Sequence, residues 1–271
     1  MGLLIRSWNI FHGRAYPADS RLYVEEAIRL VAADGPGVVC LQEVPPWALG
    51  HLEEWSGLRG FGEIAARPAF GPFPITAEVG RRLTSLDPAL LRSTFSGQAN
   101  AVLVHPGLDV LESRRIVLNE SRFRRRESRR LGLDLVARLA WAKERRVCQS
   151  VRLALPDGRH AVVANFHATG MPGDLRIADA EVLRAVSFAD ALAEPDDVLV
   201  IAGDFNALEG HSRVLAELSG PEWGFSRAGP GIDHILVRGA EPSAPTVWPV
   251  ERRSLEGVVL SDHAPVELTI E

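Results

Sequence analysis

Polar side chains suited to metal binding and acid–base chemistry stand beside short apolar runs throughout this 271-residue sequence. Eight of them are Asn9, Glu43, His167, Asp204, Asn206, Asp233, Asp262 and His263. If the apolar runs are strands, these residues lie at strand ends, where side chains can meet on one rim while the buried strand interiors hold that rim rigid. The pattern indicates an active site rich in carboxylates.

The residue types in this set favour a divalent cation. Four carboxylates brought together would repel one another, and a bound cation removes that cost. Carboxylate and amide oxygens are ligands of hard ions, so we expect Mg²⁺ or Mn²⁺. Zinc ranks low, because Cys40 and Cys148 form no Cys-x-x-Cys pair and no His-x-His-x-Asp-His string occurs.

Seven apolar runs bounded by turn residues predict the buried strands that would position these residues. They cover residues 3–8, 38–41, 101–104, 161–166, 198–202, 232–237 and 266–270. Each of the eight polar residues lies next to the end of one of these runs or within a few residues of it.

Two helices are predicted between the strands. Residues 16–33 carry apolar side chains at helical spacing, with Asp19 as the expected N-cap and a Gly-Pro-Gly stop at 35–37. A second helix is expected from a cap at Asp174 to Pro195, with one apolar face. Strands and helices thus alternate in both halves, which indicates an α/β fold of two packed sheets with helices outside.

An arginine-rich segment at 114–146 interrupts this pattern. It has two interpretations, a solvated helix or loop face, or an insertion that faces an anionic substrate. In the second interpretation Arg122, Arg124 and Arg125 would bind substrate. Residues 68–94 have weak periodicity and predict mixed loop and short helix.

The bulk composition is that of an ordinary globular protein, with 46% hydrophobic and 24% charged residues. We expect one domain over 1–271, since sheet-rich folds of this size form single units. A net charge of −5 argues against a protein that coats nucleic acid electrostatically. The N-terminus lacks the pattern of a signal peptide and no apolar run is long enough to span a membrane, so we expect a cytoplasmic protein without membrane insertion. No obligate protein partner is evident.

Six short motifs occur in an order that resembles the endonuclease/exonuclease/phosphatase family. They are SWNI at 7–10, LQEV at 41–44, NFH at 165–167, GDFNA at 203–207, IDH at 232–234 and SDHAPV at 261–266. Each motif alone is weak, since Asn, Asp and Glu commonly build turns and single histidines are commonly structural. Six in order over nearly the whole chain form a specific signal.

The resemblance implies a four-layered α-β-β-α sandwich of two mixed sheets with outer helices, like that of deoxyribonuclease I. It implies that Glu43 binds the metal, supported by Asn9 and Asp262. Asp204 would orient or deprotonate the attacking water, with Asn206 holding the phosphate or nucleophile in line.

The resemblance also implies roles for the histidines and for Asn100. His263, paired with Asp233, would donate a hydrogen bond to the phosphate. His167 would donate to the phosphate or help the leaving group to depart. Asn100 resembles a phosphate-contacting asparagine of the family, although the glycine of that motif is displaced. His234 stands where the family often has a large residue, and strand alternation predicts that it points away from Asp233.

The expected activity is metal-dependent hydrolysis of a phosphodiester, either nucleic acid or a small molecule, by in-line attack of water. Two alternatives remain open, a phosphomonoesterase acting on inositol-phosphate-like substrates and a catalytically silent scaffold of the same fold. A serine hydrolase is disfavoured because no Gly-x-Ser-x-Gly occurs.

Overall fold

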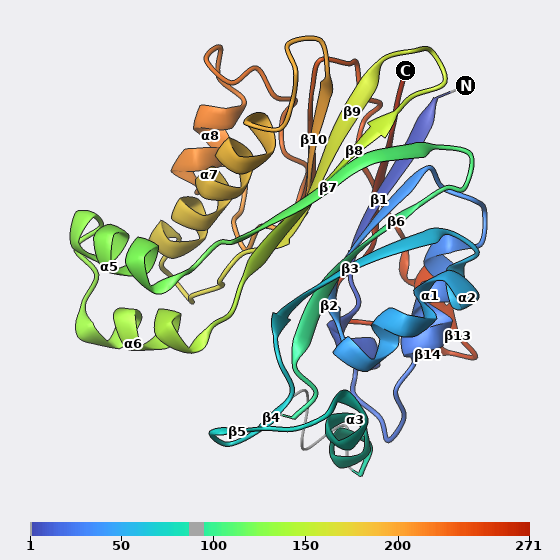
Figure 1. Ribbon diagram of the computed structural model, residues 1–271, viewed down its shortest axis with the longest axis vertical. Coiled ribbons are helices and arrows are strands. Elements are labelled where there is room, and N and C mark those ends of the chain that lie inside the picture. Colours follow the sequence, from blue (N-terminus) through green and yellow to red (C-terminus); the bar gives the residue numbers. More distant parts are fainter. Residues whose placement is uncertain (1, 87–94) are drawn as a thin grey trace. The chain divides into compact units, whose positions relative to one another are not determined.

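The computed structural model describes residues 2–86 and 95–271, and the chain divides into two compact units. Unit 1 comprises the residues up to Asp109 together with Pro242–Glu271, and unit 2 is Val110–Glu241. The single domain expected from the sequence stays a prediction. Each unit contains one main sheet with helices against it (Figure 1).

The main sheet of unit 1 has six strands in the order β12-β15-β1-β2-β6-β3. Their bounds are Leu3–Asn9 for β1, Val38–Val44 for β2, Arg59–Ala66 for β3, Gln98–Val104 for β6, Thr246–Val247 for β12 and Val266–Ile270 for β15. Strands β1 and β2 run parallel, whereas β15 runs antiparallel to β1. Because β1 and β2 are parallel, the residues at their carboxyl ends meet at one edge of the sheet.

The described residues of unit 1 also form helices and two short hairpins. Their bounds are η1 Phe11–Gly13, α1 Val24–Ala32, η2 Pro46–His51, α2 Leu52–Ser56, α3 Ala77–Ser85, η3 Val250–Arg253, β4 Ala69–Phe70, β5 Phe73–Pro74, β13 Ser254–Leu255 and β14 Val258–Val259. Helix α1 buries Val24, Ala27, Ile28 and Val31 in a cluster that includes Trp8. This burial is the stripe that helical spacing predicts.

The main sheet of unit 2 has five strands in the order β11-β10-β9-β8-β7. Their bounds are Asp109–Val117 for β7, Val147–Ala154 for β8, His160–His167 for β9, Val198–Asp204 for β10 and Asp233–Arg238 for β11. Strands β9 and β10 are parallel, and β11 is antiparallel to β10. The carboxyl ends of β9 and β10 therefore lie beside the amino end of β11.

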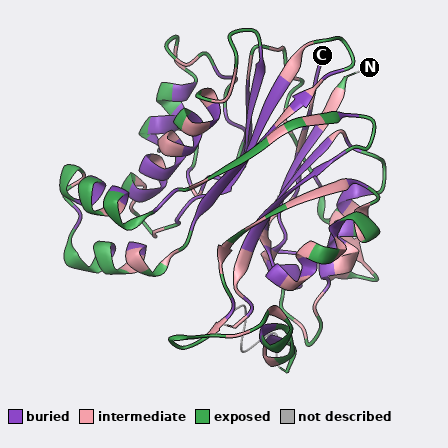
Figure 2. Cartoon of the chain, viewed as in Figure 1, coloured by how far each residue is buried: buried purple, intermediate pink, exposed green. Residues whose placement is uncertain are grey.

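Four helices belong to unit 2. They are α5 Ser121–Arg130, α6 Leu135–Lys143, α7 Arg176–Asp190 and α8 Arg213–Leu218. Helix α7 packs against β9 and β10, where Val182, Ala185 and Val186 join the main hydrophobic cluster of the unit. Helices α5 and α6 pack on a separate small cluster and are mostly exposed in Figure 2.

All seven predicted strands are confirmed, and the two mixed sheets with helices confirm the α/β class. The predicted start of the first helix is wrong. Asp19 does not cap it, because its carboxylate accepts hydrogen bonds from the Arg21 backbone N–H and the Tyr23 hydroxyl, and α1 begins only at Val24. The predicted cap at Asp174 is displaced by one residue, because the N-cap residue of α7 is Leu175, although the Asp174 carboxylate accepts from the N–H of Arg176, the first residue of α7.

The two weakly patterned segments have regular structure in part. The arginine-rich stretch contains α5 and α6 as a helical pair after β7. The stretch 68–94 contains β4, β5 and α3, and its residues 87–94 lie outside the described residues. Among the residues that the structure describes, no helix is both long and apolar enough to cross a membrane.

Candidate functional site

Three of the predicted site residues form a row across adjacent strands of unit 2. Asp204, the last residue of β10, is in register with His167, the last residue of β9, and with Asp233, the first residue of β11. All three are buried, with Asp204 only 1% exposed. The strand register thus places two carboxylates and one imidazole side by side.

Side-chain contacts join the members of this row. His167 Nε2 lies 3.4 Å from Asp204 Oδ2. A carboxylate oxygen of Asp204 lies within 4.8 Å of one of Asp233. Two buried carboxylates this close repel each other when both are ionised, and positive charge or a donated proton removes the repulsion. The row therefore has the composition of a site that transfers protons or holds a cation.

Asn206 is held beside the row by the turn after β10. Its backbone N–H donates to Asp204 Oδ1 over 3.0 Å, and its side-chain amide donates to the Ala168 carbonyl over 2.9 Å. Its φ of 48° places it in the left-handed region, which asparagine tolerates better than most residues. This geometry is an Asx turn, and it also fixes the Asn206 side chain against the loop after β9.

In unit 1, Asn9 and the segment before β15 are joined by hydrogen bonds. Asn9 is buried at the end of β1, its carboxamide oxygen accepts from Phe11 N–H, and its carbonyl accepts from the Ser261 hydroxyl over 2.7 Å. Ser261 also accepts from the His263 N–H, and the His263 carbonyl accepts from the Trp8 indole. These bonds fix the backbone that carries Asp262 and His263.

Glu43 extends from an irregular part of β2. The register between β2 and β6 shifts between Leu41 and Val44, and Glu43 has a φ of 55°. Such a bulge reorients the side chain relative to a regular strand. The Glu43 carboxylate lies 3.2 Å from His12 Nε2, and its side chain is 19% exposed.

Asp262 lies electrostatically close to Glu43. Burial raises the pKa of Asp262, and the Glu43 carboxylate raises that pKa further, whereas His263 and Arg14 act in the opposite direction. His263 Nε2 is 4.0 Å from Asp262 Oδ1. Unit 1 thus brings Asn9, Glu43, Asp262 and His263 into one region, whereas the expected pairing of His263 with Asp233 stays a prediction.

The donor chemistry of unit 1 fits a divalent cation. Glu43 and Asp262 offer carboxylate oxygens, with the Glu43 carboxylate raising the pKa of Asp262, and Asn9 offers a carboxamide oxygen. A hard cation such as Mg²⁺ or Mn²⁺ prefers these ligands and offsets that repulsion.

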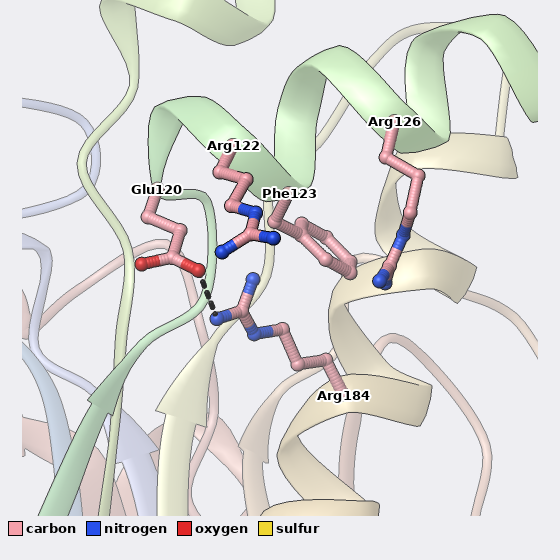
Figure 3. Close-up of a pocket in the computed structure, with 5 residues that line it drawn as sticks. All are labelled: Glu120, Arg122, Phe123, Arg126 and Arg184. Atoms are coloured by element: carbon pink, nitrogen blue, oxygen red, sulfur yellow. Dashed lines mark hydrogen bonds and ion pairs between the residues drawn. The ribbon is translucent and has the colours of Figure 1, made fainter.

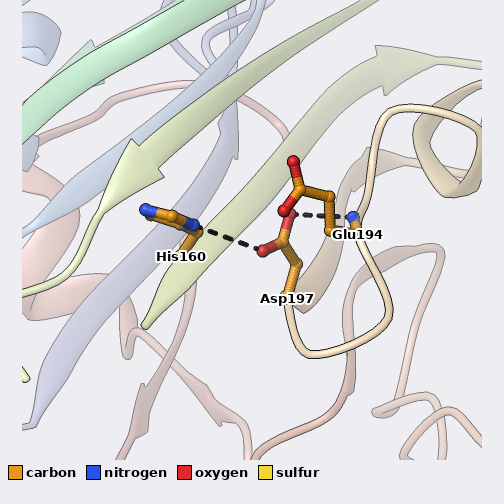
Figure 4. A group of neighbouring side chains, drawn as sticks. All are labelled: His160, Glu194 and Asp197. Atoms are coloured by element: carbon orange, nitrogen blue, oxygen red, sulfur yellow. Dashed lines mark hydrogen bonds and ion pairs between the residues drawn. The ribbon is translucent and has the colours of Figure 1, made fainter. Parts of the chain in front are cut away.

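A second acidic cluster in unit 2 does not fit a metal. His160, Glu194 and Asp197 lie together at the opposite end of β9 from His167 (Figure 4). The guanidinium of Arg152 already contacts all three, at 3.2 Å from His160 Nδ1 and 2.9 Å from each carboxylate. We therefore interpret this cluster as an ion-pair network.

The predicted substrate-binding residues lie in different places. Asn100 is buried in β6 opposite the bulge of β2 that contains Glu43, because its neighbours Ala99 and Ala101 pair with Val44 and Leu41. Arg122 and Arg125 are exposed on α5. The guanidinium of Arg124 instead donates to the Asn119 carbonyl, at the start of the same helical segment.

Two histidines require comment beside the predicted set. His12 matched no motif, yet it is buried and contacts Glu43; its position three residues after Asn9 is the one sequence signal that could have suggested it. His234 is fully buried against Phe205 and donates from Nε2 to the Ala207 carbonyl. Burial lowers the pKa of His234, which favours a neutral structural imidazole facing the core.

Comparison with solved structures supports the same architecture. A structure of endonuclease/exonuclease/phosphatase from Beutenbergia cavernae DSM 12333 is 16% identical, with a TM-score of 0.65 over 100% of this chain and 71% of that one. A humanized D. rerio TDP2 is 16% identical, with a TM-score of 0.64 over 100% and 99% of the two chains. The human Nocturnin catalytic domain with bound sulfate anion is 17% identical, with a TM-score of 0.64 over 100% and 93%. At these identities the likeness shows the fold.

The family is shown by sequence. No curated protein sequence matches the chain. The model of the Endonuclease/Exonuclease/phosphatase family matches residues 7–263, which begin at the first of the six motifs and end within the last. This match covers nearly the whole chain, and we conclude that the chain belongs to the endonuclease/exonuclease/phosphatase family.

Proposed function

We propose that this protein hydrolyses a phosphodiester by in-line attack of water, with Mg²⁺ or Mn²⁺ as cofactor. Members of its family are generally metal-dependent phosphoesterases. The observation that carries the proposal is the row of His167, Asp204 and Asp233 on three adjacent strands, with Asn206 bonded to Asp204. A scaffold without activity would have no need to keep two buried carboxylates so close together.

In this proposal Asn9, Glu43 and Asp262 hold the cation. When bound there, the cation would polarise a phosphoryl oxygen and offset the charge that develops on the phosphate. His12, in contact with Glu43, would orient that carboxylate.

Asp204 is proposed to accept the proton of the attacking water. A general base must lie within hydrogen-bond reach of the proton that it removes, and its carboxylate is held by the Asn206 N–H and approached by His167 Nε2. The Asn206 side chain would help to align the water and the phosphate.

The histidines are proposed to act on the phosphate oxygens. His263, with Asp233 as its partner, would donate a charge-assisted hydrogen bond to the phosphate, which strengthens as negative charge develops. His167 would donate to the phosphate or to the departing oxygen.

The test is hydrolysis of bis(4-nitrophenyl) phosphate and of 4-nitrophenyl phosphate with Mg²⁺, Mn²⁺ or chelator. We expect turnover of the diester that chelator abolishes. Asp204→Asn should lower kcat by about 10² to 10⁴, the usual contribution of a positioned general base. Glu43→Gln should raise the metal concentration needed for half-maximal activity.

Matched controls are Asp157→Asn and Glu54→Gln, because these carboxylates are exposed and lie in unit 2 and unit 1 respectively. Both controls should retain parental rates. Faster turnover of the monoester would favour the phosphomonoesterase alternative. A parent inactive on both esters, and on a panel of nucleic acids and inositol phosphates, would contradict the proposal and favour the silent scaffold.

A further inference from the structure

A pocket of about 490 Å³ lies between α5 and α7 in unit 2. It is lined by Glu120, Arg122, Phe123, Arg126 and Arg184. Figure 3 shows the guanidinium groups of Arg122 and Arg184 turned toward each other, with Glu120 on one side and the Phe123 ring on the other. None of the residues of the His167–Asp204–Asp233 row lines this pocket.

Positive charge in the pocket exceeds negative charge. Glu120 is the only acidic residue among the five, and it pairs with Arg184 over 3.0 Å. The Arg126 guanidinium pairs with Glu127, but that carboxylate also pairs with Arg130. The guanidinium of Arg122 makes no ion pair or hydrogen bond with any residue in 2–86 or 95–271. One face of the pocket therefore carries guanidinium charge that protein acids do not neutralise.

Arg184 is held in place by its neighbours, and one of its guanidinium nitrogens has no hydrogen-bond acceptor among the described residues. Its Cζ lies 4.2 Å from the centroid of the Phe123 ring, and its side chain is 16% exposed. Its Nη1 is buried and has no hydrogen-bond partner among the described residues. A buried N–H without an acceptor is costly, so an acceptor placed in the pocket would bind favourably. The ring and Glu120 together fix the guanidinium in advance of binding.

The arginine charges of α5 are electrostatically unfavourable for this helix. Arg122 lies in the first turn, where the helix macrodipole disfavours a cation and where no acidic residue occurs. Like charges also gather on one face of the helix, because arginines stand three, four and seven positions after Arg122, at Arg125, Arg126 and Arg129. An anion bound at this face would offset both effects.

We propose that this pocket binds a phosphate group through Arg122 and Arg184, with Arg126 nearby. Guanidinium groups match two oxygens of one phosphate, and two of them face a single space here. The ligand is an anion of at least two charges, either a small phosphorylated molecule or the terminal phosphate of a nucleic acid. This site goes beyond the hydrolytic function and does not depend on it.

The test is titration of inorganic pyrophosphate into the whole protein by calorimetry, at pH 7.5, low ionic strength and with chelator present. The parent should bind one equivalent, and the affinity should fall as salt is added. Arg122→Gln and Arg184→Gln should each weaken binding about tenfold or more. Arg122 is exposed, so its variant should fold normally even if Arg184→Gln does not.

Two controls separate this site from catalysis. Arg213→Gln removes one exposed arginine of unit 2 outside the pocket and should bind like the parent. Asp204→Asn should also bind like the parent, which keeps a failure of the hydrolytic proposal distinct from a failure of this one. Circular dichroism of each variant checks that it is folded.

Two further arms identify the source of the phosphate, a short oligonucleotide with a 5′-phosphate and the same oligonucleotide without it. Binding of the first alone, lost in Arg122→Gln, would assign a nucleic-acid terminus. Binding of pyrophosphate but of neither oligonucleotide would assign a small phosphorylated molecule. Absence of pyrophosphate binding at low salt, or equal binding in the parent and in folded Arg122→Gln, would overturn the proposal.

Discussion

Gly203 precedes the candidate catalytic Asp204 and has a backbone conformation that other residues rarely adopt. Its φ is 146°, and a Cβ atom built there would meet the Phe166 carbonyl oxygen at 1.9 Å. The close approach of β9 and β10 at this point sets the spacing between His167 and Asp204. A glycine at 203 is therefore required by the same geometry that forms the row.

Gly203→Ala should lower the free energy of unfolding by about 2 to 4 kcal/mol, because the added methyl must displace a backbone carbonyl and strain the chain. Urea denaturation measures this loss. Gly50→Ala is the matched control, because no atom lies within 4 Å of the added Cβ there and its φ is not in the left-handed region. Equal stability of the two variants would contradict the requirement.

Asp34 provides a residue-scale test of stability against pH. The hydrogen bond from Arg6 is the largest effect that lowers the pKa of Asp34, from an ordinary value of 3.8. An acid with a depressed folded pKa contributes stability above its unfolded pKa, and this contribution is lost as pH falls through the folded pKa. Asp34→Asn should therefore be less stable than the parent above pH 5.

The difference between parent and Asp34→Asn should shrink as pH falls below 3.8 and approach its low-pH limit beneath the folded pKa. Urea unfolding at a series of pH values measures it. Asp34 is half exposed, so solvent screening keeps the effect small. A difference that grew toward low pH would contradict the assignment.

At the scale of elements, a buried carboxylate connects the α5–α6 pair to the loop after β9. Glu181 of α7 is fully buried and accepts hydrogen bonds from the Trp141 indole of α6 and from the Thr169 backbone N–H, each over 2.6 Å. Thr169 follows Ala168, whose carbonyl accepts from the Asn206 amide. Glu181 therefore fixes a loop that contacts Asn206 of the candidate site, although Glu181 itself makes no hydrogen bond to the site.

Glu181→Ala should lower the free energy of unfolding by about 2 to 5 kcal/mol, since it leaves the Trp141 and Thr169 donors buried without an acceptor. It should also lower kcat more than it raises KM, because the loop beside Asn206 loses its anchor. Thermal melts and steady-state kinetics measure the two effects. The exposed Glu217→Ala in α8 is the control. A kcat unchanged in folded Glu181→Ala would show a purely structural role.

Apolar runs predicted seven strands, among them the edge strand β11, which is buried at five of its six positions, but they did not predict β3, β7 or the interior strand β8. Strand β10 is buried at every position and reads as a continuous apolar run. Strand β7 is an edge strand whose Glu112, Arg114 and Arg115 face solvent, so its sequence lacks an apolar run. Strand β3 is also an edge strand, with two glycines in its length. Strand β8 is mostly buried, but Gln149, Ser150 and Arg152 interrupt its apolar residues, so its sequence does not form an apolar run either.

The residues of the candidate site also differ in whether the sequence could place them. Asp204, His167 and Asp233 could be placed together because each stands next to a run that reads as a strand. His12 could not, because its position depends on a short 3-10 turn with a left-handed φ of 55° at His12 itself. The pocket with Arg184 was missed for another reason. Arg184 comes from α7, and only the packing of α5 on α7 brings it to Arg122.

At the scale of the whole molecule, each unit has its own hydrophobic cluster and its own part of the candidate chemistry. A cation that binds only the folded chain stabilises it by mass action, by about 2.7 kcal/mol at one hundred times its dissociation constant. The apparent Tm should therefore rise by a few degrees on addition of Mn²⁺ to chelator-treated protein.

This rise should be lost in Glu43→Gln and retained in Glu54→Gln, since Glu54 is exposed and pairs with His51 rather than with a proposed ligand. Differential scanning fluorimetry measures it. An equal rise in Glu43→Gln would place the cation elsewhere and would contradict the proposed ligand set. The measurement needs no substrate, so it tests the metal site before the reaction is known.

Both native cysteines are buried, so thiol reagents should react only with a cysteine introduced at the surface. Cys40 and Cys148 are fully buried in β2 and β8, and neither forms a disulfide. Burial raises the pKa of the Cys148 thiol to about 12, so its reactive thiolate is scarce at neutral pH. A maleimide fluorophore would therefore react with a thiol introduced on α5, as in Arg125→Cys, without removal of a native cysteine, and its emission would report the binding of anions at that helix.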